Sequence, residues 1–131
     1  MTTIKWAMVG TGYMSTLIMK DFALSKNTEF VALVSRDVNK ARSRLAAEGV
    51  NAKAVTFEQA LDDAEIDIIY LATPHDSHFL LAKRAIEAGK HVLVEKAFTM
   101  NASEATELTD LAKKHNRFLM EAMWTKFQPL H

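Results

Sequence analysis

Two glycines stand two residues apart near the amino terminus, at Gly10 and Gly12. An apolar run that is typical of a strand comes directly before them, and a segment with helical periodicity follows. Gly10 permits a tight turn, and the bare backbone of Gly12 lets a diphosphate lie against it. Amide groups at the start of the helix would then hold the negative charge. This context favours a dinucleotide-binding turn over a merely structural one, formed by Gly10, Thr11, Gly12, Tyr13 and Met14, with Ser15 in place of a third glycine.

A second set of candidate residues follows the predicted strand over 30–34. Ser35 and Arg36 come directly after it, and Lys40 lies one helical turn beyond Arg36. A hydroxyl and a guanidinium suit the 2′-phosphate of NADP, because arginine can bond a phosphate through two parallel N–H groups. An NAD enzyme usually has an acidic residue here, and Asp37 could serve, but it fits better as the N-cap of the next helix. The pattern favours NADP, with NAD as the second choice.

The third candidate segment follows the predicted strand over 66–71. Ligands of open α/β sheets bind at the carboxyl ends of the strands, near the reversal of strand order, so we expect this segment to lie near the cofactor. Two histidines three residues apart, with no cysteine and no convincing third ligand, make a poor metal site, and no metal is expected. The residues predicted to bind the cofactor here are Ala72, Thr73, Pro74, His75 and His78.

The fourth candidate is the pair Glu95 and Lys96, after the predicted strand over 91–94. The pair belongs to the same sheet edge as the glycine turn, and both residues are predicted to lie at the cofactor. A lysine in a partly desolvated cleft can donate a hydrogen bond to a substrate oxygen or pass a proton. The alternative, a solvated charge pair at a strand end, stays equally open from the spacing alone.

Short apolar runs and longer amphipathic segments alternate along the chain. Helices are predicted over 14–24, 41–48, 79–88 and 102–115, and strands over 4–9, 30–34, 54–57, 66–71, 91–94 and 118–123. Alternation of this kind predicts a doubly wound, mostly parallel sheet in three α/β/α layers, the Rossmann fold, with strand order 3-2-1-4-5-6.

Several helix ends carry signals of their own. Gly49 and Gly89 follow predicted helices, where a positive φ costs least without a Cβ atom. Two pairs of residues resemble capping boxes, namely Thr56 with Gln59 and Asn101 with Glu104.

Composition limits the function classes. The 131 residues suffice for about one domain, and 49% hydrophobic with 24% charged residues is ordinary globular usage. Sixteen Lys and Arg balance sixteen Asp and Glu, so nucleic acid and acidic membranes are not expected as partners. The absence of cysteine excludes disulfides and a cysteine nucleophile. With no secretory signal and no apolar run long enough to span a membrane, a cytoplasmic location is expected.

Taken together and in this order, the four sites resemble the amino-terminal half of the Gfo/Idh/MocA oxidoreductase family. The resemblance covers essentially the whole chain and rests on Gly10-Thr11-Gly12, on Ala72-Thr73-Pro74 with His78, and on Glu95-Lys96. The run over 120–127 is more similar to the NADP-dependent dimeric dihydrodiol dehydrogenase branch than to the inositol dehydrogenase branch. One departure is Ala97, which stands where the family has a proline that would stiffen the loop.

The resemblance implies roles for single residues. Arg36 and Lys40 match positions that hold the 2′-phosphate, Lys96 matches the catalytic lysine, and Trp124 matches an aromatic residue lining the substrate pocket. The reaction implied is hydride transfer between NADP and a sugar-like or diol carbon, with Lys96 bonding the reacting oxygen. Homo-oligomers are compatible with this family.

Family members are about twice this length or more. The resemblance therefore implies a Rossmann domain over 1–123, and a linker over 124–131 that starts into a missing carboxyl-terminal domain. Because that domain supplies most of the substrate pocket, the isolated chain is expected to bind NADP(H) with little turnover.

Three other interpretations compete with this one. A non-catalytic NAD(P)-binding sensor or regulatory module would keep the glycine turn and have no need of Lys96. An S-adenosylmethionine site would favour an acid after the second strand, so Ser35 and Arg36 argue against it. An interaction domain would use an exposed aromatic patch around Trp124 and Phe127.

Overall fold

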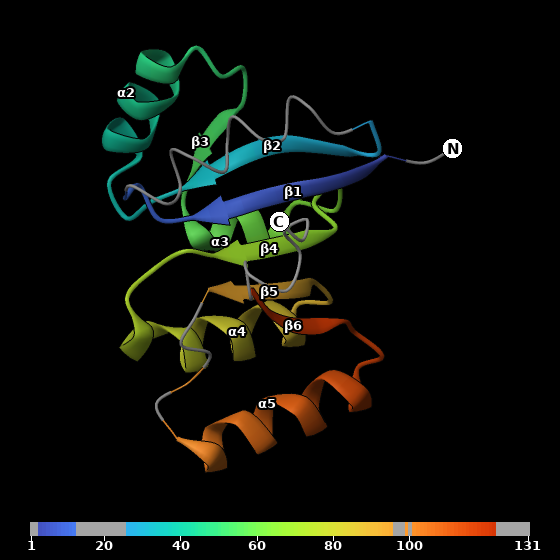
Figure 1. Cartoon of the computed structure of the whole chain (residues 1–131). Helices are drawn as coiled ribbons and strands as arrows, with labels where there is room; N and C mark the ends of the chain where they lie inside the picture. The colour runs from blue at the N-terminus through green and yellow to red at the C-terminus, as the bar shows by residue number, and fades with distance from the viewer. Residues whose placement is uncertain (1–2, 13–25, 96–98, 100, 123–131) are drawn as a thin grey trace, which may run out of the picture.

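The residues that the computed structural model describes, 3–12, 26–95, 99 and 101–122, include six strands of one parallel sheet (Figure 1). The strands are β1 (Ile4–Val9), β2 (Thr28–Val34), β3 (Lys53–Val55), β4 (Ile68–Leu71), β5 (His91–Glu95) and β6 (Leu119–Ala122). Their order, β3-β2-β1-β4-β5-β6, confirms the predicted topology. The helix predicted over 14–24 lies outside the described residues.

Helices cover both faces of this sheet. On one face, α3 (Phe57–Asp62), α4 (His78–Glu87) and α5 (Ala102–Lys114) pack against alternate strand residues such as Ala7 and Val9. On the other face, α2 (Val38–Glu48) packs through Ala41 and Leu45, and Met8 of β1 points to this side. The alternation within β1 produces two separate cores and confirms the three-layer architecture. None of the helices described here is long and apolar enough to cross a membrane.

The boundary between β3 and α3 differs from the prediction. The strand expected over 54–57 ends at Val55, and the next residue, Thr56, is the N-cap of α3. The Thr56 hydroxyl accepts a hydrogen bond from the Gln59 amide at 3.2 Å, and the Gln59 side chain accepts one from the Thr56 amide at 2.9 Å. This capping box satisfies two amides that the helix start would otherwise leave unpaired, so it outweighs the strand propensity of the apolar run. The capping box predicted for Thr56 and Gln59 is confirmed, and the predicted extension of the strand to residue 57 is wrong.

Other boundaries differ by a few residues. Helix α2 starts at Val38 instead of 41, and β4 starts at Ile68 instead of 66. Ile66 is buried in the core without belonging to the strand, which explains why its apolar character suggested one.

Asp37 caps α2, as predicted. Its Oδ1 atom accepts hydrogen bonds from the amides of Asn39 at 3.0 Å and Lys40 at 3.3 Å, and its own backbone is extended. The carboxylate is therefore committed to the helix start.

Asp37→Ala should lower the free energy of unfolding by about 1 kcal/mol, because these two amides lose their acceptor. Urea denaturation followed by circular dichroism measures the change. Asp37→Asn serves as the control, since its amide oxygen can still accept and should retain most of the stability. Equal stability of the alanine variant and the wild type would show that the cap contributes nothing.

Candidate functional site

The register of the sheet brings the four predicted segments to one level. Val9 pairs with Val34 on one side and Leu71 on the other, and Leu71 pairs with Val94. The residues that follow these four therefore stand in one row across the sheet, in the order Ser35, Gly10, Ala72 and Glu95. We call this row the carboxyl edge; it lies at the arrowheads of the strands in Figure 1. Open α/β sheets bind their ligands at such an edge.

The backbone at Gly10 leaves the sheet in a conformation that other residues rarely adopt. Its φ is 114°, and its amide donates to the Val34 carbonyl at 3.1 Å, continuing the pairing of β1 with β2. At Gly12, an added Cβ atom would find nothing within 4 Å, so open space lies beside an exposed backbone. A turn of this kind fits the diphosphate of a dinucleotide. Tyr13 and Met14, predicted to extend this site, lie outside the described residues.

Two exposed cations stand at the end of β2. Arg36 and Lys40 are both exposed. Lys40 lies in the first turn of α2, and this turn contains no acidic residue. The Asp37 carboxylate already caps this helix start, so the two cationic side chains are the groups that would attract an anion here. Ser35 is half-buried, and its hydroxyl accepts a hydrogen bond from the Asp37 amide at 3.2 Å. With Asp37 committed to capping, this set of groups suits a phosphate better than a ribose diol.

The segment after β4 is held together by local hydrogen bonds. The Ala72 amide donates to the Val9 carbonyl at 3.0 Å, which ties the start of the segment to the glycine turn. Further on, the Ser77 hydroxyl donates to the Pro74 carbonyl at 2.6 Å and lies 2.7 Å from the Thr73 hydroxyl. These bonds fix the backbone of the loop beside the carboxyl edge.

The His78 side chain contacts the backbone of this loop. His78 is the first residue of α4, it is fully buried, and its Nε2 atom lies 2.8 Å from the Thr73 carbonyl. The ring therefore fixes the loop, and a direct contact of His78 with a cofactor stays a prediction. His75 lies in the short 3-10 helix η1 (His75–Ser77), and its side chain is outside what the structure describes. In the described part of the chain, His, Asp and Glu side chains form no group of three that could hold a metal ion.

A buried tyrosine–carboxylate pair stands at the carboxyl edge. The Tyr70 hydroxyl, from β4, donates to the Glu95 carboxylate at the end of β5, and both side chains are buried. Burial, followed by the hydrogen bond to Glu95, raises the pKa of Tyr70 well above its usual value, so the phenol stays protonated. The interpretation of Glu95 as a solvated charge is therefore wrong. Lys96 lies outside the described residues.

Sequence reasoning missed Tyr70, which sits in an otherwise aliphatic strand. The usable signal was its phenol, because a buried tyrosine hydroxyl usually has a hydrogen-bond partner.

A buried lysine, Lys90, occupies the opposite edge of the sheet. Lys90 precedes β5, is 5% exposed, and donates from Nζ to the carbonyls of Asp63 at 2.6 Å and Ile66 at 2.8 Å. Burial lowers its pKa, since the charged form loses solvation. These bonds tie together the segments that enter β4 and β5, which is a structural role far from the carboxyl edge.

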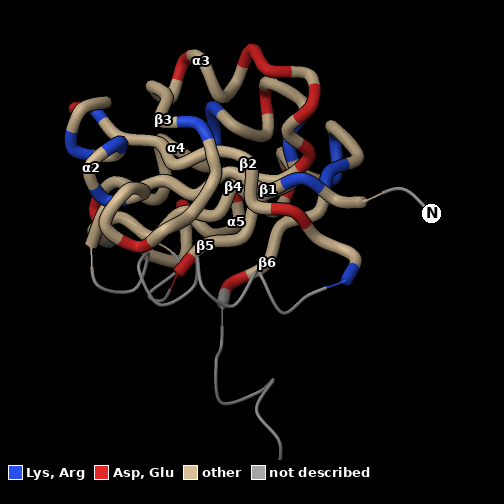
Figure 2. Tube along the Cα trace, turned by 90° about the horizontal axis from the view of Figure 1, so that it is seen from above, with Lys and Arg blue, Asp and Glu red and all other residues tan. Residues whose placement is uncertain are grey.

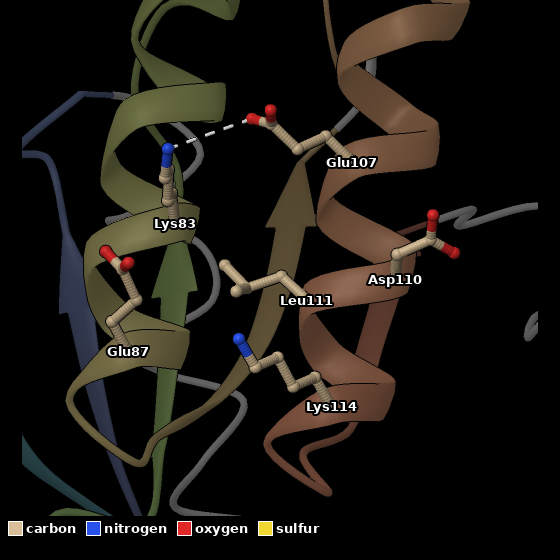
Figure 3. A pocket seen from close by; sticks show the side chains of 6 residues that line it. All are labelled: Lys83, Glu87, Glu107, Asp110, Leu111 and Lys114. Carbon is tan, nitrogen blue, oxygen red and sulfur yellow. Dashed lines mark ion pairs between the residues drawn. The ribbon is translucent and has the colours of Figure 1, made fainter.

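A surface hollow of about 380 Å³ lies between α4 and α5. Figure 3 shows its charged lining, in which Lys83 and Glu107 approach to 3.9 Å across the two helices. The lining residues are Lys83, Glu87, Glu107, Asp110, Leu111 and Lys114. They belong to the helical layer, so the hollow is separate from the candidate site.

Positive and negative residues are also interspersed along the rest of the described chain, as Figure 2 shows.

Comparison with known proteins bears on this site. Residues 4–123 match the family model described as an oxidoreductase family with an NAD-binding Rossmann fold. A D-xylose 1-dehydrogenase (NADP(+)) from Hypocrea jecorina is 36% identical, over 98% of this chain and 36% of the relative. A trans-1,2-dihydrobenzene-1,2-diol dehydrogenase from Xenopus laevis is 32% identical, over 97% of this chain and 39% of the relative. The chain thus spans somewhat more than a third of the length of these relatives.

Solved structures share the fold. A mutant 3-ketoreductase from Actinomadura kijaniata, in complex with TDP-benzene and NADP, superposes with a TM-score of 0.91 at 25% identity, covering 98% of this chain and 41% of that one. An NAD-binding protein from Listeria innocua gives a TM-score of 0.86 at 29% identity, covering 96% and 37% of the respective chains.

Proposed function

This chain belongs to the Gfo/Idh/MocA oxidoreductase family, with its NAD-binding Rossmann fold, and from that membership we propose that it is the cofactor-binding part of an NADP-dependent enzyme. The enzyme would act on the CH–OH or carbonyl group of a sugar-like or diol substrate. The observation that carries the proposal is the single row of Ser35, Gly10, Ala72 and Glu95 at the carboxyl edge. Four segments from different parts of the chain meet there, at the place where such folds bind dinucleotides.

The glycine turn binds the diphosphate in this proposal. Gly10 turns the chain away from the sheet, and Gly12 offers open space in which a side chain would otherwise lie. The backbone amides of Thr11 and Gly12 would donate to the phosphate oxygens. The sequence prediction for Tyr13 and Met14 at the same site stays a prediction.

The end of β2 selects NADP over NAD. The guanidinium of Arg36 and the ammonium of Lys40 neutralise the 2′-phosphate, and the hydroxyl of Ser35 donates to it. The commitment of Asp37 to α2 supports this choice, because an acid that caps a helix is poorly placed to bond a ribose diol. The xylose dehydrogenase relative, named as NADP-dependent, supports the same choice.

Chemistry takes place beside the end of β5. Bound NADP(H) supplies or accepts the hydride. Lys96 follows Glu95 directly, and its ammonium donates a hydrogen bond to the reacting substrate oxygen or moves the proton. Trp124, which lies outside the described residues, would line the substrate pocket by the family resemblance. The diol and sugar dehydrogenases among the relatives support this substrate class.

Calorimetric titration of the 131-residue chain with NADPH and NADH tests the proposal. We expect NADPH to bind at least about tenfold more tightly, since one charge-assisted hydrogen bond contributes about 1.5 kcal/mol or more. Failure to bind either nucleotide would remove the proposed function. Equal weak binding of both would remove the assignment of Ser35, Arg36 and Lys40 to the 2′-phosphate.

A further inference from the structure

We propose that Tyr70 is a positioning residue: its hydroxyl fixes the Glu95 carboxylate at the carboxyl edge and thereby sets the shape of the cofactor site beside the end of β5. This inference rests on the proposed function and deepens it. It adds a residue that touches neither substrate nor cofactor, and it assigns that residue to one half of the cofactor site.

The geometry follows from the parallel register of two neighbouring strands. Tyr70 pairs laterally with Leu93, so Glu95 lies two residues further along β5. Side chains alternate between the faces of a strand, which places Leu93 and Glu95 on the same face as Tyr70. The long phenol spans the diagonal to the next position on that face, and its hydroxyl meets the carboxylate.

The packing around Tyr70 holds its ring in place. Only 2% of the residue is exposed, and its ring belongs to the core cluster that includes Met8, Phe30 and Leu33. A tyrosine has few rotatable bonds, so a packed ring fixes the position of its hydroxyl. Glu95 is 9% exposed, and a buried carboxylate is costly unless hydrogen bonds satisfy it. The bond therefore restricts both partners.

The position of the pair decides which part of the cofactor it affects. A doubly wound sheet has two halves, and each binds one mononucleotide of the cofactor. Ser35 and Arg36 lie in the half formed by β1, β2 and β3, which takes the adenosine end. Tyr70 and Glu95 belong to the half formed by β4, β5 and β6, which takes the nicotinamide end. Loss of the Tyr70 hydroxyl should thus disturb one end of the cofactor only.

The experiment compares two ligands on the Tyr70→Phe variant of the 131-residue chain. NADPH reaches both halves of the site, whereas 2′,5′-ADP carries only the adenosine end. We expect NADPH affinity to fall about three- to tenfold, the range for loss of one hydrogen bond, and 2′,5′-ADP affinity to stay unchanged. The emission of bound NADPH should change as well, because its nicotinamide would sit differently.

Two further variants keep the result interpretable. Ile86→Val removes one buried methyl group from α4, and we expect it to lower stability and leave both affinities unchanged. Glu95→Gln removes the charge at the other end of the bond and should show the same split between ligands. Combining it with Tyr70→Phe should add no further loss, because both changes act on one hydrogen bond; losses that add up would overturn the role of Tyr70. Equal losses for both ligands, or no loss for either, would overturn the role of Tyr70. Wild-type chain that binds neither ligand would instead overturn the proposed function.

Discussion

Replacing Gly12 with valine is expected to lower the affinity for NADPH by about 100-fold while leaving the fold intact. An added Cβ atom at this position would meet nothing within 4 Å beyond the two adjoining residues, so the free energy of unfolding should change by no more than about 0.5 kcal/mol. The same side chain would occupy the space in which the diphosphate lies against the backbone. Loss of about two amide–phosphate hydrogen bonds accounts for the size of the effect.

Calorimetry with NADPH and thermal unfolding together measure this separation of binding from stability. Gly49→Ala is a control with the opposite expectation. Gly49 ends α2 with a φ of 67°, so alanine there should cost about 1 kcal/mol of stability and leave NADPH binding unchanged. Wild-type affinity in Gly12→Val would mean that the diphosphate does not lie on this turn.

Arg36→Ala should lower NADPH affinity by about 10- to 100-fold and leave NADH affinity unchanged. A charge-assisted hydrogen bond contributes about 1.5–3 kcal/mol to NADPH binding. NADH has no 2′-phosphate, so it makes no such bond with Arg36 and loses nothing in the variant. The preference for NADPH should therefore collapse in the variant. Titrations with both nucleotides, at one fixed salt concentration, provide the measurement.

Arg42→Ala provides a matched control on the helix that follows Arg36. Arg42 is exposed, belongs to α2, and its guanidinium donates to the Asn39 side chain at 2.7 Å. Its removal deletes the same charge without touching the end of β2, so NADPH affinity should stay within about twofold of wild type. Equal losses in Arg36→Ala and Arg42→Ala would point to general electrostatic attraction instead of a 2′-phosphate site.

Much of the fold could be predicted from the sequence, because the signals involved are local. The run over 4–9 is apolar except for Lys5, as expected for a parallel strand covered by helices on both faces. Asp37 and Thr56 marked helix starts through side chains that reach only two or three residues along the chain. With strands and helices alternating, right-handed crossovers limited the strand order to very few choices.

Phe57 shows where local reasoning fails. The residue is apolar and continues an apolar run, so the sequence predicts that it belongs to the strand. In the structure it starts α3 and points its ring into the core between helix and sheet. A buried position favours an apolar residue in a strand and in a helix alike, so hydrophobicity alone does not distinguish a strand from a helix.

The pairing of Tyr70 with Glu95 could not be predicted, because it depends on contacts between residues 25 positions apart. The prediction needs the register of β4 against β5, and a shift by one residue would turn the phenol to the opposite face of the sheet. Glu95 was recognised from its place beside Lys96, yet its burial depends on neighbouring strands. The candidate site was thus predicted as a set of segments, and its internal bonds required the structure.

The central claim is that the backbone turn over 10–12 holds the diphosphate of NADP(H). Titration of the ¹⁵N-labelled chain with NADPH, followed by amide NMR spectra, tests it most directly. We expect the amide resonances of Gly10, Thr11 and Gly12 to shift more than that of Lys90, which lies at the opposite edge of the sheet. The shifts should saturate with the dissociation constant that calorimetry gives. Saturable NADPH binding that leaves these three amides unperturbed would contradict the claim.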